Sequence, residues 1–472
     1  MSRTTAAPDE RRLLLLSLAL SAAFLMETLD STILVAALPA IAADFGVPVL
    51  SVNLTVSLYL MVMAATIPAS GWLADRFGAK RLFLGAMVAF MVTSLGAALA
   101  PNLSTLVAMR ILQAIAGALM TPVGRLLLIR NAPPAQLAAA IAWMSMPALV
   151  GPILGPLVGG YLVTYASWPW VFAVKLPFGL AGLILAARLL PADEPRPAQR
   201  FDSWGFLYCA LVLGAAQLLL EQLVHRFLNA EQLAALLLVM TVALLLAVRH
   251  FRRCATPVLD PSLLRLPLFR TAFCAGGLSR LGLNALPFLL QLQLQLGFGW
   301  SAARAGWVVL CIALSALLLK PLMRLVLGRY GFRRTLAGNA VLAVLTMVLL
   351  AGCTANTPLP LLVLVVLVFG VSRSLQFNAI NTLMYAEIPK SRQSASTALG
   401  SVGQQLAMGL GISVAAVLVS QLQQLGLTLP ATAMSGAMLA VAALTALSGW
   451  LFLSLAPDAG AVVSGAGSPK KA

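Results

Sequence analysis

The stretch GWLADRFGAKR, from Gly71 to Arg81, lies between two apolar runs of about twenty residues each. It holds one acidic and three basic residues and has a glycine at position 78. An apolar run of that length can cross a bilayer as a helix, and a short charged stretch with glycine favours a turn in water. The stretch therefore predicts a hairpin of two membrane-spanning helices, and similar units recur along the chain.

The composition of the whole chain indicates a membrane protein. Of its 472 residues, 61% are hydrophobic and 10% are charged, whereas about a quarter of a soluble domain is charged. A soluble fold could not bury so much apolar surface. The five cysteines are scattered without CxxC spacing, and there are only two histidines. We therefore expect no disulfide framework, no metal site, no cofactor and no enzymatic activity.

Apolar runs of about the length of a spanning helix occur fourteen times, separated by proline, glycine or charged residues. We expect the first run to be retained, because it is too long for the core of a signal peptide. The fold class is thus an all-α polytopic membrane protein. The predicted spans are 13–38, 50–73, 81–100, 104–129, 137–163, 170–190, 204–222, 232–249, 271–296, 303–325, 335–353, 359–382, 396–420 and 433–456.

The basic residues predict the orientation of these spans. The net charge is +17, and 23 of the 31 Lys and Arg residues lie at the termini or in alternate loops. Arg226 is the one basic residue of the other loops, and seven lie within spans. Cytoplasmic loops carry the excess of Lys and Arg, so both termini are expected in the cytoplasm and the number of spans is even. The positive charge is then a matter of topology and does not indicate a nucleic-acid partner.

Two polar, proline-containing stretches, 191–202 and 249–270, look like linkers, and two spans lie between them. Six spans precede this insertion and six follow it. We therefore expect an N-terminal half (1–190), linkers with two inserted helices (191–270), a C-terminal half (271–457) and a cytoplasmic tail (458–472). The basic glycine turn Gly328–Arg334 after span ten weakly echoes Gly71–Arg81. Two six-helix halves are typical of alternating-access carriers.

Four motifs follow one another along the first half of the chain: LDSTI at 29–33, GWLADRFGAKR at 71–81, RILQ at 110–113 with glycine at 117, and GPILGPLVGG at 151–160. In this order they resemble the motifs of the major facilitator superfamily, specifically its fourteen-span drug:proton antiporter branch. Ala114 and Ala116 replace glycines of the third of these motifs, in span four, which reduces close backbone approach there. The PVGR, ASWPW and YGFRR stretches also resemble MdtD-type multidrug transporters.

This resemblance implies a proton-coupled exporter of small molecules, a multidrug efflux antiporter in the bacterial inner membrane. Its partners would be the substrate, protons and the lipid bilayer, and it would be a monomer. The resemblance also supplies the direction of transport, because the charge pattern gives topology alone.

Only two carboxylates, Glu27 and Asp30, lie deep in the predicted bilayer. They are three residues apart and so share a helix face. Mutual repulsion and burial favour proton binding by at least one of them, which suits a proton-coupling site. The resemblance favours Asp30 and adds Arg110 as its partner. The alternative is that one acid makes only a structural hydrogen bond to a neighbouring helix.

Two further motifs have roles that the resemblance implies. The first would form a gating loop at the cytoplasmic side, although an ordinary positive loop has the same composition; its residues are Gly71, Asp75, Arg76, Gly78, Lys80 and Arg81. The second would form an antiporter hinge, in which small residues pack closely and prolines bend the helix; its residues are Gly151, Pro152, Gly155, Pro156, Gly159 and Gly160.

Basic residues within spans fall into two groups. Arg304, Lys175, Arg125 and Lys320 lie near predicted span ends, and we expect their side chains to snorkel to the interface. Arg280 and Arg373 lie deeper and have no acid nearby in sequence. They could attract an anionic substrate, or they could cap carbonyls or pair with Glu387 or Asp30.

The predicted substrate cavity combines the two deep arginines with neutral polar residues: Arg280, Arg373, Gln113, Gln295 and Asn378. An adaptable apolar surface for diverse drugs could come from apolar side chains nearby, although packing against lipid is the alternative; these residues are Trp143, Met144, Met146, Phe288 and Phe377. The alternative is export of a small anionic metabolite or metal chelate, similar to citrate or a siderophore. A passive channel is a third, weaker hypothesis.

Overall fold

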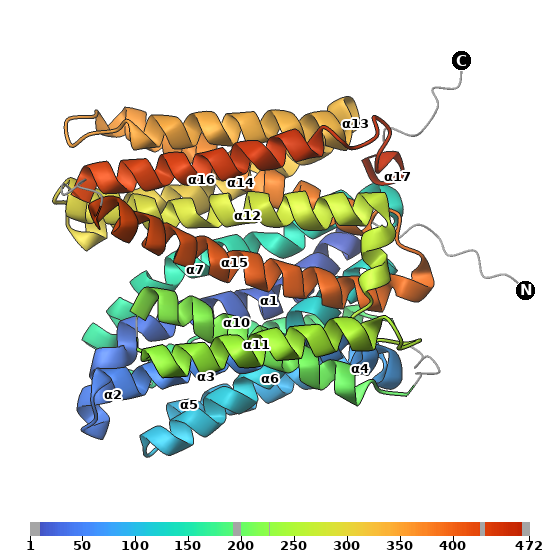
Figure 1. Cartoon of the computed structure of the whole chain (residues 1–472), viewed down its shortest axis with the longest axis horizontal. Coiled ribbons are helices and arrows are strands. Elements are labelled where there is room, and N and C mark those ends of the chain that lie inside the picture. Colours follow the sequence, from blue (N-terminus) through green and yellow to red (C-terminus); the bar gives the residue numbers. More distant parts are fainter. Residues whose placement is uncertain (1–9, 192–199, 226, 425–429, 465–472) are drawn as a thin grey trace, which may run out of the picture.

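The protein is a bundle of helices in the computed structural model, which describes residues 10–191, 200–225, 227–424 and 430–464 (Figure 1). Every regular element in those ranges is helical, and the long helices run along the longest axis of the molecule. The all-α prediction is confirmed for the described part of the chain.

The first group of helices, blue to cyan-green in Figure 1, reaches residue 189. Its elements are α1 (Glu10–Ile33), η1 (Leu34–Ala37), α2 (Leu38–Phe45), α3 (Val49–Thr66), η2 (Ile67–Ala69), α4 (Ser70–Phe77), α5 (Ala79–Ala98), α6 (Leu103–Asn131), η3 (Pro134–Gln136), α7 (Leu137–Tyr165), α8 (Trp170–Ala173) and α9 (Leu176–Leu189).

The remaining helices follow the first linker. They are α10 (Ser203–His225), α11 (Ala230–Phe251), η4 (Pro261–Arg265), α12 (Pro267–Leu292), the π-helical η5 (Gln293–Gly297), α13 (Ala302–Ala351), α14 (Leu359–Tyr385), η6 (Lys390–Arg392), α15 (Gln393–Gln424), α16 (Pro430–Phe452) and α17 (Ala461–Ser464).

Twelve helices in the described residues are long and apolar enough to cross a bilayer. Two shorter apolar stretches, Leu137–Met146 and Arg304–Ser315, lie where the fifth and tenth predicted spans begin. The fourteen-span count and the cytoplasmic position of both termini stay predictions.

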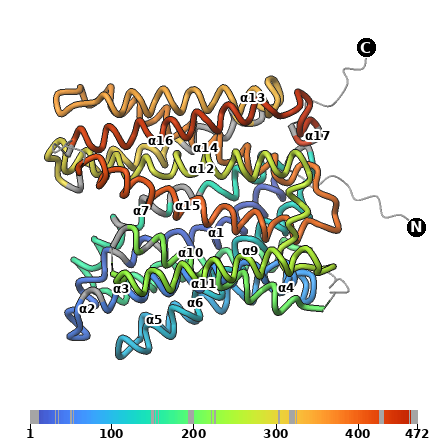
Figure 2. Tube along the Cα trace, in the orientation of Figure 1, coloured from blue at the N-terminus to red at the C-terminus, as the bar shows by residue number. Residues whose placement is uncertain are grey.

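Two packed groups of helices result, and α10 lies against both. Helices α1 to α9 pack on one another, as do α12 to α16. The groups meet where α7 packs on α13 and α14, and where α15 packs on α4 and α6. Helix α10 contacts α3 of one group and α15 of the other, while α11 lies outside it on the near face in Figure 2.

The quoted stretch at 71–81 is more helical than its loop-like composition predicts. Residues 70–77 form α4, and the chain turns only at Gly78, whose φ is 87°. The equivalent turn is at Gly331, whose φ is 69° and whose non-helical backbone divides α13 into two helices, 302–330 and 332–351. Only glycine adopts such a φ without strain, so each basic turn depends on its glycine.

The predicted first span, 13–38, ends just before Pro39. In the structure this proline does not end the helical run. It lies in the first turn of α2, which continues to Phe45. Proline is tolerated there because the backbone N–H that it lacks has no partner in the first turn of a helix.

Helices α1 and α7 are in close contact along the predicted hinge motif. A Cβ atom on Gly151 would lie 2.2 Å from Thr28 Oγ1, and one on Gly155 would lie 2.0 Å from Thr32 Oγ1. On Gly159 it would meet the Ile33 carbonyl oxygen at 2.6 Å. These three glycines therefore let the two backbones approach each other, as small residues do in membrane helices.

The rest of the predicted hinge is less constrained. A Cβ on Gly160 would have no heavy atom within 4 Å, so this glycine has no packing requirement. Residues 152 and 156 are helical, but the side chains of Pro152 and Pro156 lie outside those that the structure describes. The hinge role itself stays a prediction.

Gly155→Ala is expected to destabilise the protein, because the added methyl group must push Thr32 and the α1 backbone away. Overpacking of this kind typically costs about 1–3 kcal/mol. Gly160→Ala is the matched control on the same helix. Thermal unfolding in detergent should show a lowered midpoint for Gly155→Ala alone. Equal midpoints for the two variants would contradict the close packing of α1 and α7.

Candidate functional site

A buried ion cluster lies among the first nine helices, centred on Asp30 of α1, whose side chain is 1% exposed. Arg110 of α6 donates from Nη1 to Asp30 Oδ2 at 2.5 Å, and Lys175 forms an ion pair with Oδ1. Gln113 accepts a hydrogen bond from Arg110 at 2.7 Å. Burial makes an unpaired charge costly, so one carboxylate and two cations hold each other in place.

Aromatic rings and a carbonyl complete the surroundings of these two cations. The guanidinium of Arg110 lies 4.1 Å from the centre of the Tyr59 ring and donates from Nε to the Thr55 carbonyl at 3.3 Å. The Lys175 ammonium lies 5.2 Å from the centre of the Phe172 ring. Rings attract cations with their π faces, so they compensate part of the lost hydration.

The burial of Lys175 corrects the expectation that its side chain snorkels to the interface. Lys175 follows α8 and caps α9, at a helix break that points the ammonium inward to Asp30. The break between α8 and α9 was not predicted. A signal was nevertheless present in the sequence, because a lysine within an apolar run needs an acid and only two acids lie deep in the predicted bilayer.

Glu27 faces the same helix as Asp30 but has different partners. Thr121 of α6 donates a short hydrogen bond to Glu27 Oε2, and the charge of Arg125 acts on this carboxylate. The two acids thus both face α6, as their spacing predicts, yet each belongs to its own network.

Arg125 joins the two groups of helices and also corrects the expectation of snorkelling. Its side chain is 1% exposed. It donates to Gln404 Oε1 at 2.9 Å and to the Tyr385 hydroxyl at 3.3 Å, on α15 and α14. Glu27 and this inter-group contact are therefore linked through one arginine. Two other basic residues were also expected to snorkel. Arg304 is exposed and stacks on Trp300, and the side chain of Lys320 lies outside those described.

Arg280 and Arg373 are paired with amides. Arg280 of α12 donates to Asn381 Oδ1 at 2.8 Å, and Arg373 of α14 donates to Asn284 Oδ1 at 3.0 Å. The Arg280 side chain is buried, and its Nε has no partner among the described residues. Neither arginine forms an ion pair with a described acid, so the alternatives of pairing with Glu387 or Asp30 are not realised here.

The remaining predicted cavity residues have different partners. Gln113 belongs to the Asp30 cluster instead. Asn378 is buried and donates to Ser374 on its own helix at 2.8 Å. Gln295 is half-buried in η5, about 22 Å along the helix from Arg280 at a rise of 1.5 Å per residue.

The predicted gating residue Asp75 lies at a second contact between the groups. Its Oδ1 accepts from Arg130 Nη2 at 2.8 Å and from the Ser394 hydroxyl at 2.7 Å, at the start of α15. A Cβ on Gly71 would lie 2.8 Å from the Ser394 carbonyl oxygen, so α4 and α15 touch closely. Arg130 was missing from the predicted gate, because nothing in its own sequence surroundings indicates the contact.

The other residues of the predicted gating loop have separate positions. Lys80 donates to the carbonyl of Leu190 at 2.5 Å, and Gly78 makes the turn described above. Arg76 and Arg81 are exposed. Only Gly71 and Asp75 of the predicted set therefore reach the opposite group of helices.

A neighbouring ion pair fixes the linker before α12 to the start of α15. Arg392 donates to Asp260 Oδ2 at 2.6 Å. Partial burial raises the pKa of Asp260, but the hydrogen bonds from Ser262 and Arg392 and the charge of Arg392 outweigh burial and hold the pKa below its usual value. This carboxylate is therefore charged at neutral pH.

The sequence model of the Major Facilitator Superfamily matches residues 20–251 and 272–471. The chain belongs to this superfamily. The predicted family membership is thus confirmed, and the protein is a transporter rather than an enzyme.

Several bacterial relatives of this protein are named "Putative multidrug resistance protein MdtD". The one from Salmonella heidelberg is 34% identical over 420 residues, covering 89% of each chain. That from Pectobacterium carotovorum is 36% identical over 403 residues, covering 85% of this chain and 86% of its own. The predicted resemblance to MdtD-type transporters is therefore confirmed.

Solved structures of the superfamily share the fold at low identity. The human organic anion transporter MFSD10 (TETRAN) has a TM-score of 0.66 at 17% identity and covers 94% of this chain and 100% of its own. The proton:xylose symporter XylE has a TM-score of 0.63 at 13% identity, covering 94% and 96%. These likenesses establish the fold of this superfamily member and carry no information on its substrate.

Asp75→Asn is expected to loosen the contact between α4 and α15 of this superfamily transporter. The amide retains an oxygen acceptor but loses the charge that Arg130 pairs with, which is worth about 1.5–3 kcal/mol, or roughly tenfold or more in an opening equilibrium. Hydrogen exchange followed by mass spectrometry should accelerate in the first turns of α15. Arg81→Gln, at an exposed residue of the same stretch, should leave exchange unchanged. Unaltered exchange in Asp75→Asn would contradict the contact.

Proposed function

We propose that the protein is a proton-coupled antiporter that exports small molecules, including multiple drugs, by alternating access. The name of the MdtD relatives supports multiple drugs as the class of substrate. The observation that carries the coupling proposal is the buried Asp30 carboxylate between two cations. Exchange of protons for substrate would then drive export across the bacterial inner membrane, with the protein acting as a monomer.

Protonation of Asp30 would change the forces on three helices at once. A neutral carboxyl group attracts Arg110 and Lys175 far less than the carboxylate does, because both interactions are ion pairs in a medium of low dielectric constant. Arg110 is on α6, Lys175 is before α9 and Asp30 is on α1. Loading one proton would therefore weaken the connections among these helices and favour their rearrangement.

The path from the proton to the substrate would run along α1. Glu27 lies almost one helical turn before Asp30 and interacts with Arg125, which contacts Gln404 and Tyr385 of the other group. A shift of α1 on protonation of Asp30 would alter this contact between the groups. Glu27 and Arg125 are thus placed to sense both the proton and a substrate bound between the two groups.

The contact at Asp75 supports a gate at the end of the molecule that carries the basic loops. By the positive-inside pattern we propose that this end is cytoplasmic, so that the structure is closed towards the cytoplasm. We also propose fourteen spans with both termini in the cytoplasm. The halves would be 1–190 and 271–457, with the hairpin α10–α11 inserted between them and the tail from 458 cytoplasmic.

A second candidate function, export of a small anionic metabolite or metal chelate such as a citrate-like or siderophore-like molecule, is supported by the arginines. Arg280 and Arg125 are buried near enough for their charges to repel each other. Arg280 and Arg373 each donate a hydrogen bond to a neutral amide, Arg280 also lies 5.5 Å from the centre of the Phe377 ring, and neither forms an ion pair with a described acid. An anionic group would compensate these charges, and it would bind through charge-assisted hydrogen bonds.

Asp30→Asn is expected to abolish uphill, proton-driven efflux and to spare substrate exchange down its gradient, because the amide cannot load a proton as a carboxylate does. Proteoliposomes with an imposed pH gradient measure the first activity, and counterflow without a gradient measures the second. Glu27→Gln is the comparison variant: loss of uphill efflux in Asp30→Asn but not in Glu27→Gln would assign the proton site to Asp30. The reverse result would assign coupling to Glu27 and contradict the choice of Asp30.

A protonophore added to the same wild-type proteoliposomes should abolish uphill efflux. This follows from coupling, because collapse of the proton gradient removes the driving force. A flux that the protonophore leaves unchanged would instead indicate a passive channel.

Arg280→Gln separates the two substrate classes. If anions bind at this guanidinium, the loss of charge-assisted hydrogen bonds of about 1.5–3 kcal/mol should lower anion affinity roughly ten- to a hundredfold. A panel of drugs and carboxylates tested in one preparation measures this change. Arg304→Gln, at an exposed arginine, is the control. Intact anion flux together with robust drug efflux in Arg280→Gln would eliminate the anion hypothesis.

A further inference from the structure

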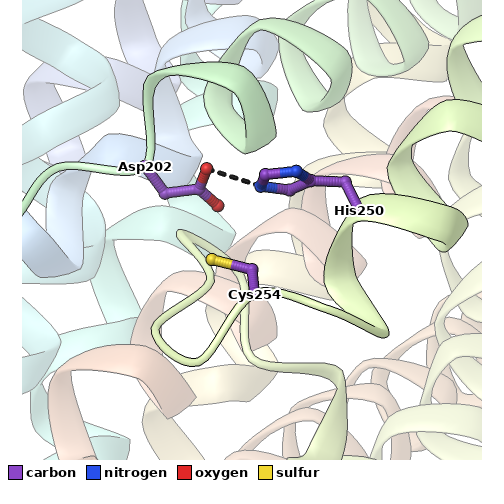
Figure 3. Close-up of side chains that lie close together, drawn as sticks. All are labelled: Asp202, His250 and Cys254. Atoms are coloured by element: carbon purple, nitrogen blue, oxygen red, sulfur yellow. Dashed lines mark hydrogen bonds and ion pairs between the residues drawn. The ribbon is translucent and has the colours of Figure 1, made fainter.

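Three side chains of different chemistry converge at one end of the inserted hairpin (Figure 3). Asp202 precedes α10, His250 is in the last turn of α11, and Cys254 is in the loop that follows. His250 Nε2 lies 2.7 Å from Asp202 Oδ1. One oxygen, nitrogen and sulfur atom of the three residues all lie within 4.8 Å of one another.

The carboxylate of this cluster is held in place by backbone groups. Asp202 Oδ1 accepts from the Gly205 N–H at 2.9 Å, and Oδ2 accepts from the Val258 N–H at 3.2 Å. The Asp202 side chain is 5% exposed and that of His250 is 26% exposed. The cluster is thus ordered from within, yet an ion from solvent can reach it.

We propose that Asp202, His250 and Cys254 form a binding site for Zn²⁺. Imidazole nitrogen, thiolate sulfur and carboxylate oxygen are the donor types that zinc prefers, at bond lengths of about 2.0–2.3 Å. Magnesium and calcium favour sets of oxygen ligands and would not select the thiolate. Small side-chain movements from the present separations bring the three donors onto one ion. Three protein ligands leave the fourth position of a tetrahedral ion for water.

Local charge and hydrogen bonding are compatible with a cation here. The carboxylate and the thiolate bring two negative charges to the ion, which balance its own charge. Arg252 and Arg253 next to Cys254 are exposed, so that solvent screens their repulsion. The N–H of Val258 supports Asp202 as an outer partner, a feature that orients metal-binding carboxylates.

The ion would fasten both linkers of the hairpin beside the Asp75 contact. Asp202 ends the first linker, and Cys254 belongs to the second. Phe201 packs on Trp72 of α4 with ring centres 4.8 Å apart, and Asp260 of the second linker binds Arg392 next to α15. A bound zinc ion would thereby hold the ends of the hairpin against the two helices that form this contact. The proposal does not depend on proton coupling or on the substrate.

The test uses the purified full-length protein with its affinity tag removed. Titration with zinc chloride should show one ion bound per chain. His250→Gln and Cys254→Ser should each weaken binding by at least about tenfold. Cys274→Ser, at an exposed cysteine outside the cluster, should bind as wild type. Unchanged affinity in both cluster variants would place the zinc elsewhere and overturn the proposal.

A second readout needs no substitution and is therefore independent of whether the variants fold. Zinc should slow alkylation of Cys254 in the wild-type protein, measured by peptide mass spectrometry, and should leave alkylation of Cys274 unchanged. Equal alkylation of Cys254 with and without zinc would also overturn the proposal. Thermal melting without zinc checks that each variant is folded before its affinity is compared.

Discussion

The carboxylate of Asp30 holds the first group of helices together through two ion pairs in the dry interior. Removing one member of a buried pair leaves an uncompensated charge and costs about 3–5 kcal/mol, whereas water would screen the same pairs almost completely. Arg110 and Lys175 come from helices that are distant in sequence, so α1, α6 and α9 are mutually positioned by a single acid. For the proposed coupling, the same dependence would make a proton an effective signal, because one proton removes the charge on which both pairs depend.

The other parts of the site extend outward from this centre. Glu27, almost one turn along α1, reaches Arg125 and through it the second group of helices. At the end of the molecule, Asp75 joins α4 to α15. These two contacts of α4 and α6 with the second group are made by charged side chains with hydrogen-bonding partners, in addition to the packing of α7 on α13 and α14. Such contacts have discrete made and broken states, which suits a protein that alternates between two conformations.

Prediction from sequence succeeded where one local pattern determines the outcome. The spacing of Gly151, Gly155 and Gly159 predicts close helix packing, and the motifs predict the superfamily. Prediction failed where contacts between residues distant in the sequence determine the position of a side chain. Lys175 and Arg125 lie near the ends of predicted spans, so their side chains were expected to reach the interface. Their sequence positions do not reveal the helix break that turns Lys175 inward or the opposing helices that Arg125 contacts. Asp202 and His250 are 48 residues apart, so that only folding of the hairpin brings them together.

The two groups of helices differ electrically. Buried cations of the first group have carboxylates beside them, whereas Arg280 and Arg373 of the second group form no ion pair with a described carboxylate. A cation without a counter-ion carries its charge with it when its helix moves across the membrane. The membrane potential does work on such movement, about 2.3 kcal/mol per charge for the full thickness at 100 mV. Under the proposed alternating access, motion of the second group would therefore be sensitive to the membrane voltage.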